Sequence, residues 1–234
     1  MLPDWLNRFL GALERGVSLQ DVGRSAQFTA QVEKVARALS RTGATPNALT
    51  VFSLVPALLA AVFAAYGAFG WSVVFMLLSG IMDLLDGPLA RATGRSSRFG
   101  ALLDSTLDRI SDALPLIGLT IFFAREGWGW AAAIPSFALL TGYTVSYVRA
   151  RCEGLAIALP PLWMRRGDRI VLVAVSLLAG MIAPVLVLIG TAIAGLLSLL
   201  AATDALRVAH RECLLADATA PGRSHSPSSG SGTV

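Results

Sequence analysis

Long apolar stretches alternate with short polar connections between residues 48 and 206. The first stretch has the roughly 20 consecutive apolar residues that an α-helix needs to cross the hydrocarbon core of a bilayer. Five more follow, and the Ala183-Pro184 pair separates the last two. The pattern predicts six transmembrane helices, at Ala48–Phe69, Trp71–Leu85, Phe99–Ala124, Trp130–Val148, Ile170–Ile182 and Val185–Leu206.

Two amphipathic stretches precede these helices, and a polar tail follows them. Leu2–Leu13 and Phe28–Arg41 each place apolar residues on one helical face, as helices lying on a membrane surface do; packing on a partner is the alternative. The tail is rich in Ser, Gly, Pro and Thr, which predicts disorder. We therefore expect an all-α integral membrane protein with six transmembrane helices preceded by amphipathic juxtamembrane helices. Its parts are a cytoplasmic N-terminal segment (1–44), a membrane domain (45–213) and the tail (214–234).

The composition agrees with a membrane protein. Of the 234 residues, 55% are hydrophobic and 15% charged, and the mean hydropathy is +0.66; a soluble domain carries about a quarter charged residues. The basic residues (19 Lys and Arg against 15 Asp and Glu) are interleaved with apolar runs, which excludes a nucleic-acid footprint. Cys152 and Cys213 form neither a disulfide framework nor a metal-binding spacing.

Basic residues concentrate in alternate connections between the predicted helices. The opposite connections hold only Arg125, next to Glu126. Because cytoplasmic loops carry the excess of Lys and Arg, both termini are predicted to be cytoplasmic. The basic residues on this side are Arg41, Arg91, Arg95, Arg98, Arg151, Arg165, Arg166, Arg207 and Arg211. We interpret Arg165, Arg166 and Arg211 as flanking charges that contact lipid headgroups.

Acidic residues interrupt the second and third apolar stretches. A buried Asp at the bilayer centre costs about 2.5–3.5 kcal/mol, so these acids must face water, pair with cations or bind metal. Two sets each fall on one helical face: Asp83, Asp86, Gly87, Ala90 and Arg91, and then Gly100, Asp104, Asp108 and Asp112. Clustered carboxylates without His or Cys suit Mg²⁺ or Mn²⁺, and two such ions can clamp a diphosphate. A structural polar network and the ion path of a transporter are the alternatives.

The remaining residues of these two faces suit a nucleotide. Gly87 and Gly100 allow its close approach to the helix backbone, and Ala90 keeps the same face open. Arg91 offers a planar fork to phosphate oxygens. Asp112 extends the acidic stripe as a supporting residue, and Arg109 is a candidate ion-pair partner for Asp108.

The pattern Asp83-x2-Asp86-Gly87-x2-Ala90-Arg91-x8-Gly100-x3-Asp104-x3-Asp108 resembles, at every defined position, the signature of the CDP-alcohol phosphotransferases. The resemblance runs from Thr45-Pro46-Asn47 to about Arg207. It implies a two-metal site at Asp83, Asp86 and Asp104, bordered by Asp108 as both metal ligand and general base. It also implies that Asp83, Gly87, Ala90, Arg91 and Gly100 bind the CDP moiety, that CMP leaves, and that the protein is a homodimer.

A second pattern concerns the acceptor alcohol. Ser146-Tyr147-Val148-Arg149-Ala150-Arg151, with Arg169 twenty residues after Arg149, resembles the prokaryotic phosphatidylinositol-phosphate synthases. That group reads Ser-Tyr-Ile-Lys-Ala-Arg, so Arg149 stands in place of Lys. The resemblance implies an acceptor-phosphate site at Ser146, Arg149, Arg169 and Arg207. Three arginines suit a phosphorylated acceptor, because a neutral alcohol offers them no charge to pair with.

The two resemblances together predict an enzyme of the cytoplasmic membrane of a prokaryote, with its active site on the cytoplasmic side. It would transfer a phosphatidyl group from CDP-diacylglycerol to inositol phosphate with the help of two Mg²⁺ or Mn²⁺ ions, without nucleic acid. Phosphatidylglycerol-phosphate synthesis, whose acceptor also carries phosphate, is the nearest alternative. A metal-ion or anion transporter is the alternative from another class.

Overall fold

The computed structural model describes residues 26–160 and 163–219, and all regular structure within these ranges is helical. The predicted helix Leu2–Leu13 and residues 220–234 of the predicted tail lie outside the described residues. The helices are α3 (Ala26–Ser40), α4 (Pro46–Phe52), α5 (Leu54–Ala65), α6 (Phe69–Ala92), α7 (Arg98–Arg125), α8 (Ala133–Gly154), α9 (Arg166–Gly180) and α10 (Pro184–Thr219).

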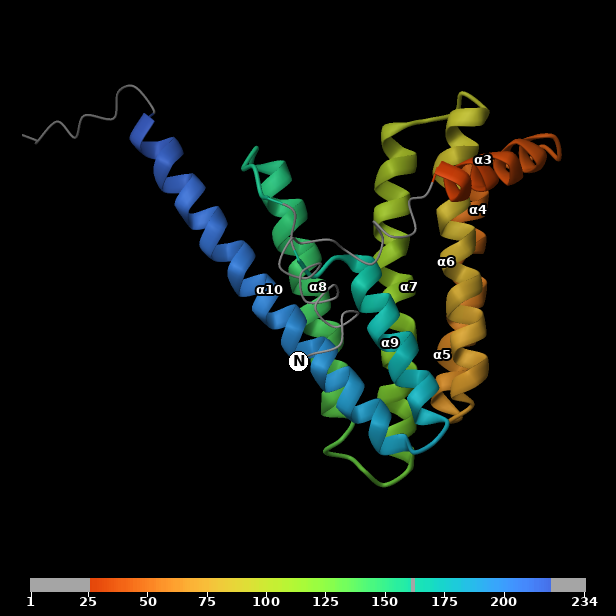
Figure 1. Cartoon of the computed structure of the whole chain (residues 1–234), viewed down its shortest axis with the longest axis vertical. Helices are drawn as coiled ribbons and strands as arrows, with labels where there is room; N and C mark the ends of the chain where they lie inside the picture. Colours follow the sequence, from red (N-terminus) through yellow and green to blue (C-terminus); the bar gives the residue numbers. More distant parts are fainter. Residues whose placement is uncertain (1–25, 161–162, 220–234) are drawn as a thin grey trace, which may run out of the picture.

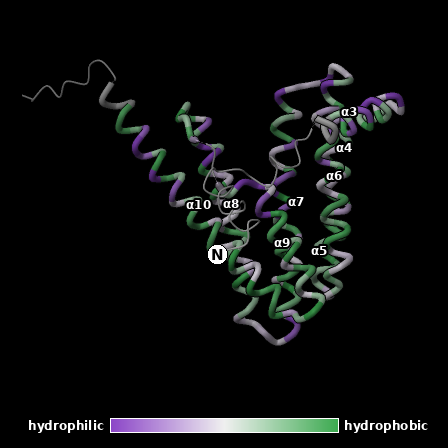
Figure 2. The backbone as a smooth tube through the Cα atoms, viewed as in Figure 1, coloured by the Kyte–Doolittle hydropathy of each residue, from purple (hydrophilic) through white to green (hydrophobic). Residues whose placement is uncertain are grey.

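Helices α5 to α10 form a bundle that is closed at one end and open at the other. They converge at the end that carries the connections α5–α6, α7–α8 and α9–α10, and they diverge toward the opposite end (Figure 1). Hydrophilic positions gather around the beginning of α9 and the neighbouring part of α7, whereas the converging end is largely hydrophobic (Figure 2). The fold therefore places polar residues inside the open half of an apolar bundle.

Three described segments are long and apolar enough to cross a membrane: Pro46–Ala65, Phe69–Ala92 and Pro184–Leu215. The all-helical membrane character predicted from the sequence is confirmed at this level. Helices α7, α8 and α9 also correspond to predicted spans, but they are more polar or shorter. A count of six spans therefore stays a prediction.

The first predicted span is not one uninterrupted helix, because α4 ends at Phe52 and α5 begins at Leu54. The cause is Pro56, which has no N–H to donate to the carbonyl of Phe52 one turn earlier. Ser79 of α6 donates a hydrogen bond of 2.8 Å to the carbonyl of Ser53. The break is thereby fixed against the neighbouring helix.

Helix α3 confirms the helix predicted at Phe28–Arg41. It lies across the ends of α4 and α6 instead of running along the bundle (Figure 1), and it packs against α6. Ala36 is fully buried, whereas Val35 is 49% exposed. Part of its apolar surface therefore covers α6 of the same chain, and its position on a membrane surface stays a prediction.

Small residues bring the helices of the closed end together. A Cβ atom on Gly118 of α7 would lie 2.2 Å from the carbonyl oxygen of Ala61 on α5, so the two backbones nearly touch. Large side chains fill the space beside this contact, among them Phe69, Leu119, Phe122, Phe123, Leu177 and Val187. Helices α8 and α10 pack through a second cluster in which α10 contributes the alanines Ala201, Ala202, Ala205 and Ala209.

Helix boundaries differ from the predicted spans mainly where polar residues continue a helix. Helix α6 continues to Ala92 and α8 to Gly154, past the ends of the apolar stretches. Helix α10 continues to Thr219, into the segment predicted as tail. The boundary between the last two spans is as predicted, since α9 ends at Gly180 and α10 begins at Pro184.

Candidate active site

The acidic faces of α6 and α7 meet in the open half of the bundle. Asp83, Asp104 and Asp108 each offer a carboxylate oxygen, and these three atoms lie within 4.8 Å of one another. All three residues are partly buried. The spacing of four residues along α7 brings Asp104 and Asp108 onto the same face, and the turn between the two helices directs that face toward Asp83. The sequence pattern thus corresponds to one carboxylate cluster.

Asp86 lies beside this cluster, close enough to Asp83 and Asp104 for their charges to interact. It is only 7% exposed, and its Oδ2 accepts a hydrogen bond of 2.7 Å from the Thr50 hydroxyl on α4. Thr50 is itself 3% exposed. The short helix α4 therefore fixes one carboxylate of the signature, a contact across 36 residues of sequence.

Arg166, the first residue of α9, enters the carboxylate cluster. Its Nη1 lies 2.8 Å from Asp83 Oδ2 and 2.9 Å from Asp108 Oδ2. Its Nε donates to both oxygens of Asp112, each at 3.1 Å. Interpreting Arg166 as a flanking charge at the lipid headgroups is therefore wrong, because its guanidinium pairs with three acids inside the bundle.

The donor set fits a divalent metal ion. Among the residues that the structure describes, Asp108 has a buried side-chain oxygen, Oδ1, without a hydrogen-bond partner. A buried carboxylate oxygen of this kind is an available ligand. Several carboxylate oxygens close together, without nitrogen or sulfur donors, match the preference of Mg²⁺ and Mn²⁺. Asp83, Asp104 and Asp108 are placed to bind such an ion.

The residues predicted to bind CDP lie beside this cluster. Gly87, Ala90 and Gly100 are partly buried, and Arg91 is exposed at the end of α6. Nη1 of Arg91 lies 3.6 Å from the position that a Cβ atom on Gly87 would take, so this side chain folds over the glycine. A Cβ atom on Gly100 would lie 3.2 Å from the side-chain oxygen of Asn47. Asn47 therefore borders the same surface, although no role was predicted for it.

A cavity of about 210 Å³ adjoins the cluster and is rich in arginine. Arg169 donates a hydrogen bond of 3.0 Å to the Ser146 hydroxyl across α9 and α8. Arg149 lines the same cavity, with its Nε 3.2 Å from Glu153 and its side chain 55% exposed. The cavity is also lined by Asp108, Asp112, Arg109, Arg165 and Arg166. Arg207 lies exposed on α10 and does not line it.

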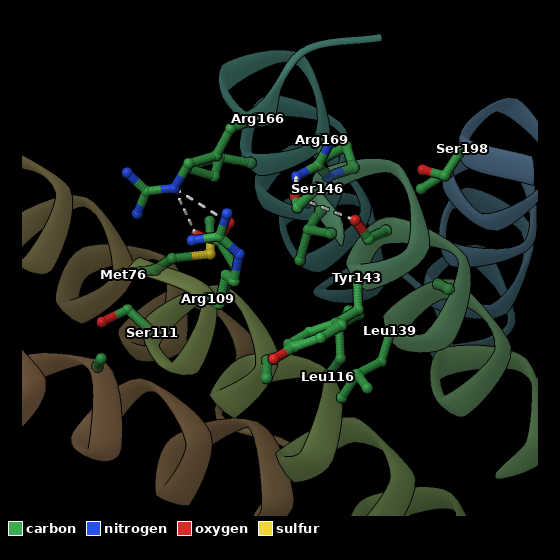
Figure 3. Close-up of a pocket in the computed structure, with 18 of the residues that line it drawn as sticks. Met76, Arg109, Ser111, Leu116, Leu139, Tyr143, Ser146, Arg166, Arg169 and Ser198 are labelled. Carbon is green, nitrogen blue, oxygen red and sulfur yellow. Dashed lines mark hydrogen bonds and ion pairs between the residues drawn. The ribbon is translucent and has the colours of Figure 1, made fainter. Parts of the chain in front are cut away.

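A second cavity of about 80 Å³ continues toward the closed end of the bundle and shares Ser146, Arg166 and Arg169 with the first. Figure 3 shows Arg169 beside Ser146, with Arg166 and Arg109 at one side and Tyr143 among leucines at the other. Gly142 has no side chain, and Arg169 passes 3.4 Å from the position that its Cβ atom would take. The arginine-lined cavity is thus the polar entrance to a largely apolar interior.

Of the residues singled out in the sequence, the structure brings together the acids on α6 and α7 and the pair Ser146–Arg169. It leaves Arg207 apart from them. Thr50 and Arg166 were missed. Arg166 stands three residues before Arg169, and this spacing, which places both on one side of α9, was a signal that could have been used. Thr50 offered only a hydroxyl within an apolar stretch.

Comparison with known proteins identifies the class to which this fold and site belong. The family model for CDP-alcohol phosphatidyltransferases matches residues 43–203. The match covers more than half of the chain and includes the acids of α6 and α7. The chain therefore belongs to the CDP-alcohol phosphatidyltransferase family.

Individual relatives are phosphatidylinositol phosphate synthases. The one from Mycobacteroides abscessus is 33% identical over 149 residues, which is 62% of this chain and 67% of the relative. The one from Streptomyces avermitilis is 37% identical over 155 residues, which is 64% of this chain and 63% of the relative. The similarity thus spans about two thirds of these relatives.

Solved structures show the same fold. The phosphatidylinositol phosphate synthase of Mycobacterium tuberculosis with CDP-DAG bound has a TM-score of 0.71 at 25% identity, covering 76% of this chain and 92% of that protein. Another structure of that enzyme, with a TM-score of 0.69, is in complex with manganese and citrate.

Proposed function

We propose that the protein transfers the phosphatidyl group of CDP-diacylglycerol to a hydroxyl of inositol phosphate and releases CMP. The observation that carries this proposal is the arginine-lined cavity, in which Arg169 is hydrogen-bonded to Ser146 and which Asp108 also lines. A cavity with several arginines suits a phosphorylated acceptor, and the carboxylate beside it suits proton transfer. The similarity to phosphatidylinositol phosphate synthases supports inositol phosphate as this acceptor.

Asp108 would act as the general base. Its carboxylate lines the arginine-lined cavity and has two oxygens, so one can accept the proton of the acceptor hydroxyl while the other binds a metal ion. The hydroxyl oxygen then forms a bond to the phosphorus that carries the diacylglycerol, and the bond from this phosphorus to the oxygen of CMP breaks. Asp83, Asp86 and Asp104, together with Asp108, would hold two Mg²⁺ or Mn²⁺ ions, which supply positive charge to the diphosphate and to the leaving CMP.

The two substrates would lie on either side of Asp108. Gly87, Ala90 and Gly100 leave room for the CDP moiety, with Arg91 at its edge. The acceptor phosphate would bind Arg169, whose orientation is set by Ser146, and Arg149 at the exposed rim. Arg207 does not line the cavity, so the proposed phosphate site rests on the other three residues.

We propose the same membrane arrangement that the sequence predicts. A domain of residues 45–213 would cross the cytoplasmic membrane of a prokaryote six times, with both termini and the site on the cytoplasmic side. The distribution of basic residues supports this orientation. A homodimer is proposed on the resemblance to the family alone.

The test is CMP release from proteoliposomes that contain CDP-diacylglycerol. Separate reactions receive inositol phosphate, glycerol 3-phosphate, free inositol or serine, and turnover is expected only with the first. Turnover only with glycerol 3-phosphate would replace the acceptor but keep the reaction type. Metal-ion flux without any CMP release would indicate a transporter.

Arg169→Ala separates the acceptor site from the rest of the active site. It is expected to raise the KM for inositol phosphate at least about tenfold, because a charge-assisted hydrogen bond contributes about 1.5–3 kcal/mol. The KM for CDP-diacylglycerol should change little. Equal increases in both KM values would show that Arg169 does not bind the acceptor.

A further inference from the structure

Arg166 contacts two of the carboxylate groups that a metal ion would also need. Its Nη1 lies within 2.9 Å of Oδ2 of both Asp83 and Asp108, and these two residues belong to the cluster of three that fits a divalent ion. The side chain is only 29% exposed, so water screens its charge weakly. An oxygen that accepts a short charge-assisted hydrogen bond from a guanidinium has less capacity to coordinate a cation.

The two cations also repel each other. Mg²⁺ binds carboxylate oxygens at about 2.0–2.1 Å, and Nη1 lies 2.8 and 2.9 Å from Oδ2 of Asp83 and Asp108. An ion bound by these two carboxylates would therefore lie within a few ångströms of the guanidinium. Like charges this close in a partly buried site oppose each other strongly.

Arg166 has a second anchor that a metal ion would not take away. Its Nε donates to both oxygens of Asp112, which lies outside the cluster of three. If Nη1 left Asp83 and Asp108, the bond to Asp112 could hold the guanidinium at the edge of the arginine-lined cavity, which Arg166 also lines. The contact with Asp112 therefore does not depend on the oxygens of Asp83 and Asp108.

We propose that Arg166 is a built-in competitor of the divalent metal ion for Asp83 and Asp108. This inference rests on the metal site proposed above. The competition lowers the affinity of the carboxylates alone for metal. Stable metal binding then depends on the additional oxygens that the diphosphate of the CDP-lipid brings. Arg166 in this way links metal binding to the presence of the substrate.

The test measures metal binding without turnover. Full-length protein in lipid nanodiscs, with neither substrate added, is titrated with Mn²⁺, and free Mn²⁺ is followed by electron paramagnetic resonance. Arg166→Gln is expected to bind Mn²⁺ at least about tenfold more tightly than the wild type, because removing a unit charge a few ångströms away has a large effect in a partly buried site. Unchanged or weaker binding by the folded variant overturns the proposal.

Arg149→Gln is the matched control. It removes the same charge from the same cavity, but Arg149 pairs with Glu153 and not with the acids of the cluster. Its Mn²⁺ affinity should stay within about twofold of the wild type, given the weak effect of exposed charges. An equal gain in affinity in this variant would show that the net charge of the cavity is decisive, and would overturn the competition.

A further variant covers the case in which Arg166→Gln does not fold. Arg166→Lys keeps the charge but lacks the fork that reaches Asp112 and the other two acids together. Its Mn²⁺ affinity should exceed that of the wild type, and an affinity equal to the wild type would contradict the proposal. If neither the wild type nor any Arg166 variant binds Mn²⁺ at the cluster, the proposed metal site fails. This result differs from equal binding by the wild type and the variants, which would contradict the competition alone.

Discussion

Single residues hold the signature carboxylates in two different ways. Asp83 and Asp108 face the guanidinium of Arg166, whereas Asp86 is buried and accepts a hydrogen bond from Thr50. A hydrogen bond to a metal-binding carboxylate fixes the direction of its oxygens. The Thr50 hydroxyl also lies 3.0 Å from the carbonyl oxygen of Pro46, so its position is set by α4. Thr50 is thus a candidate positioning residue for Asp86.

Replacing Thr50 tests this role. Thr50→Val keeps the shape of the side chain but removes the donor, so the Mn²⁺ concentration for half-maximal CMP release is expected to rise about tenfold or more. Thr50→Ser keeps the hydroxyl and should remain close to the wild type. If Thr50→Val and Thr50→Ser change the required Mn²⁺ concentration equally, packing and not the hydrogen bond explains any loss.

Replacing Asp108 tests the proposed base. Asp108→Asn keeps the size of the side chain but cannot accept the proton, so the rate of CMP release should fall by at least about 100-fold. Binding of CDP-diacylglycerol, measured by calorimetry, should remain because Asp83, Asp86 and Asp104 are unchanged and the amide carbonyl of the variant can still coordinate a metal ion. Turnover near that of the wild type would remove Asp108 from this role.

The sequence predicts which residues share one helix face much better than it predicts which residues touch between helices. The spacing of four between Asp104 and Asp108 follows directly from the helical repeat, and a known signature extends it to Asp83. The bond from Arg166 to Asp112 joins residues 54 positions apart, and that from Thr50 to Asp86 joins residues 36 apart. Such contacts depend on how the helices pack, which periodicity along one helix does not determine.

Between elements, the contact of α5 with α7 brings two helix backbones close together. It depends on Gly118, whose backbone lies against the carbonyl of Ala61. A helix backbone cannot move away as the end of a flexible side chain can. The contact therefore fixes the distance between these helices close to the acids that α7 carries.

Gly118→Ala is expected to destabilise the protein by about 1–3 kcal/mol, because the added methyl group has no room. Gly80→Ala on α6 is the matched control, since its added Cβ would meet no atom within 4 Å beyond the adjacent residues and backbone of its own helix. Thermal unfolding in detergent measures both variants. A lower Tm for Gly118→Ala alone would support the close contact, and equal values for both variants would argue against it.

The break between α9 and α10 was predicted from the sequence, but the break between α4 and α5 was not. A proline lies at or near each of them. Pro184 was a reliable signal because it begins α10 after a short turn that follows α9. Pro56 lies inside an apolar stretch, where membrane helices often contain proline without ending. Only the structure shows that α4 stops before it and that Ser79 of α6 bonds the Ser53 carbonyl at the break.

On the scale of the whole molecule, the most apolar segments lie toward the two ends of the described chain and the more polar helices lie between them. The segments long and apolar enough to cross a membrane are α4–α5 and α6 at one end of the chain and α10 at the other. Helices α7, α8 and α9 lie between them in sequence and carry Asp104, Asp108, Ser146, Arg166 and Arg169. Apart from the part of the signature on α6, which includes Asp83 and Asp86, the polar residues of the site therefore lie in the helices that are least suited to lipid.

This order has a consequence for how the protein is made. An isolated α7 would expose Asp104, Asp108 and Asp112 to hydrocarbon, at about 2.5–3.5 kcal/mol for each carboxylate near the bilayer centre. In a translocon insertion assay with glycosylation reporters, α6 and α10 alone should integrate efficiently and α7 alone poorly. Efficient integration of α7 alone would contradict this. Placing α6 before α7, and α9 with its Arg166 after it, should improve integration, because the acids then acquire neighbours. The polar helices would thus enter the membrane as a group during biosynthesis, and late synthesis of α10 would complete their enclosure.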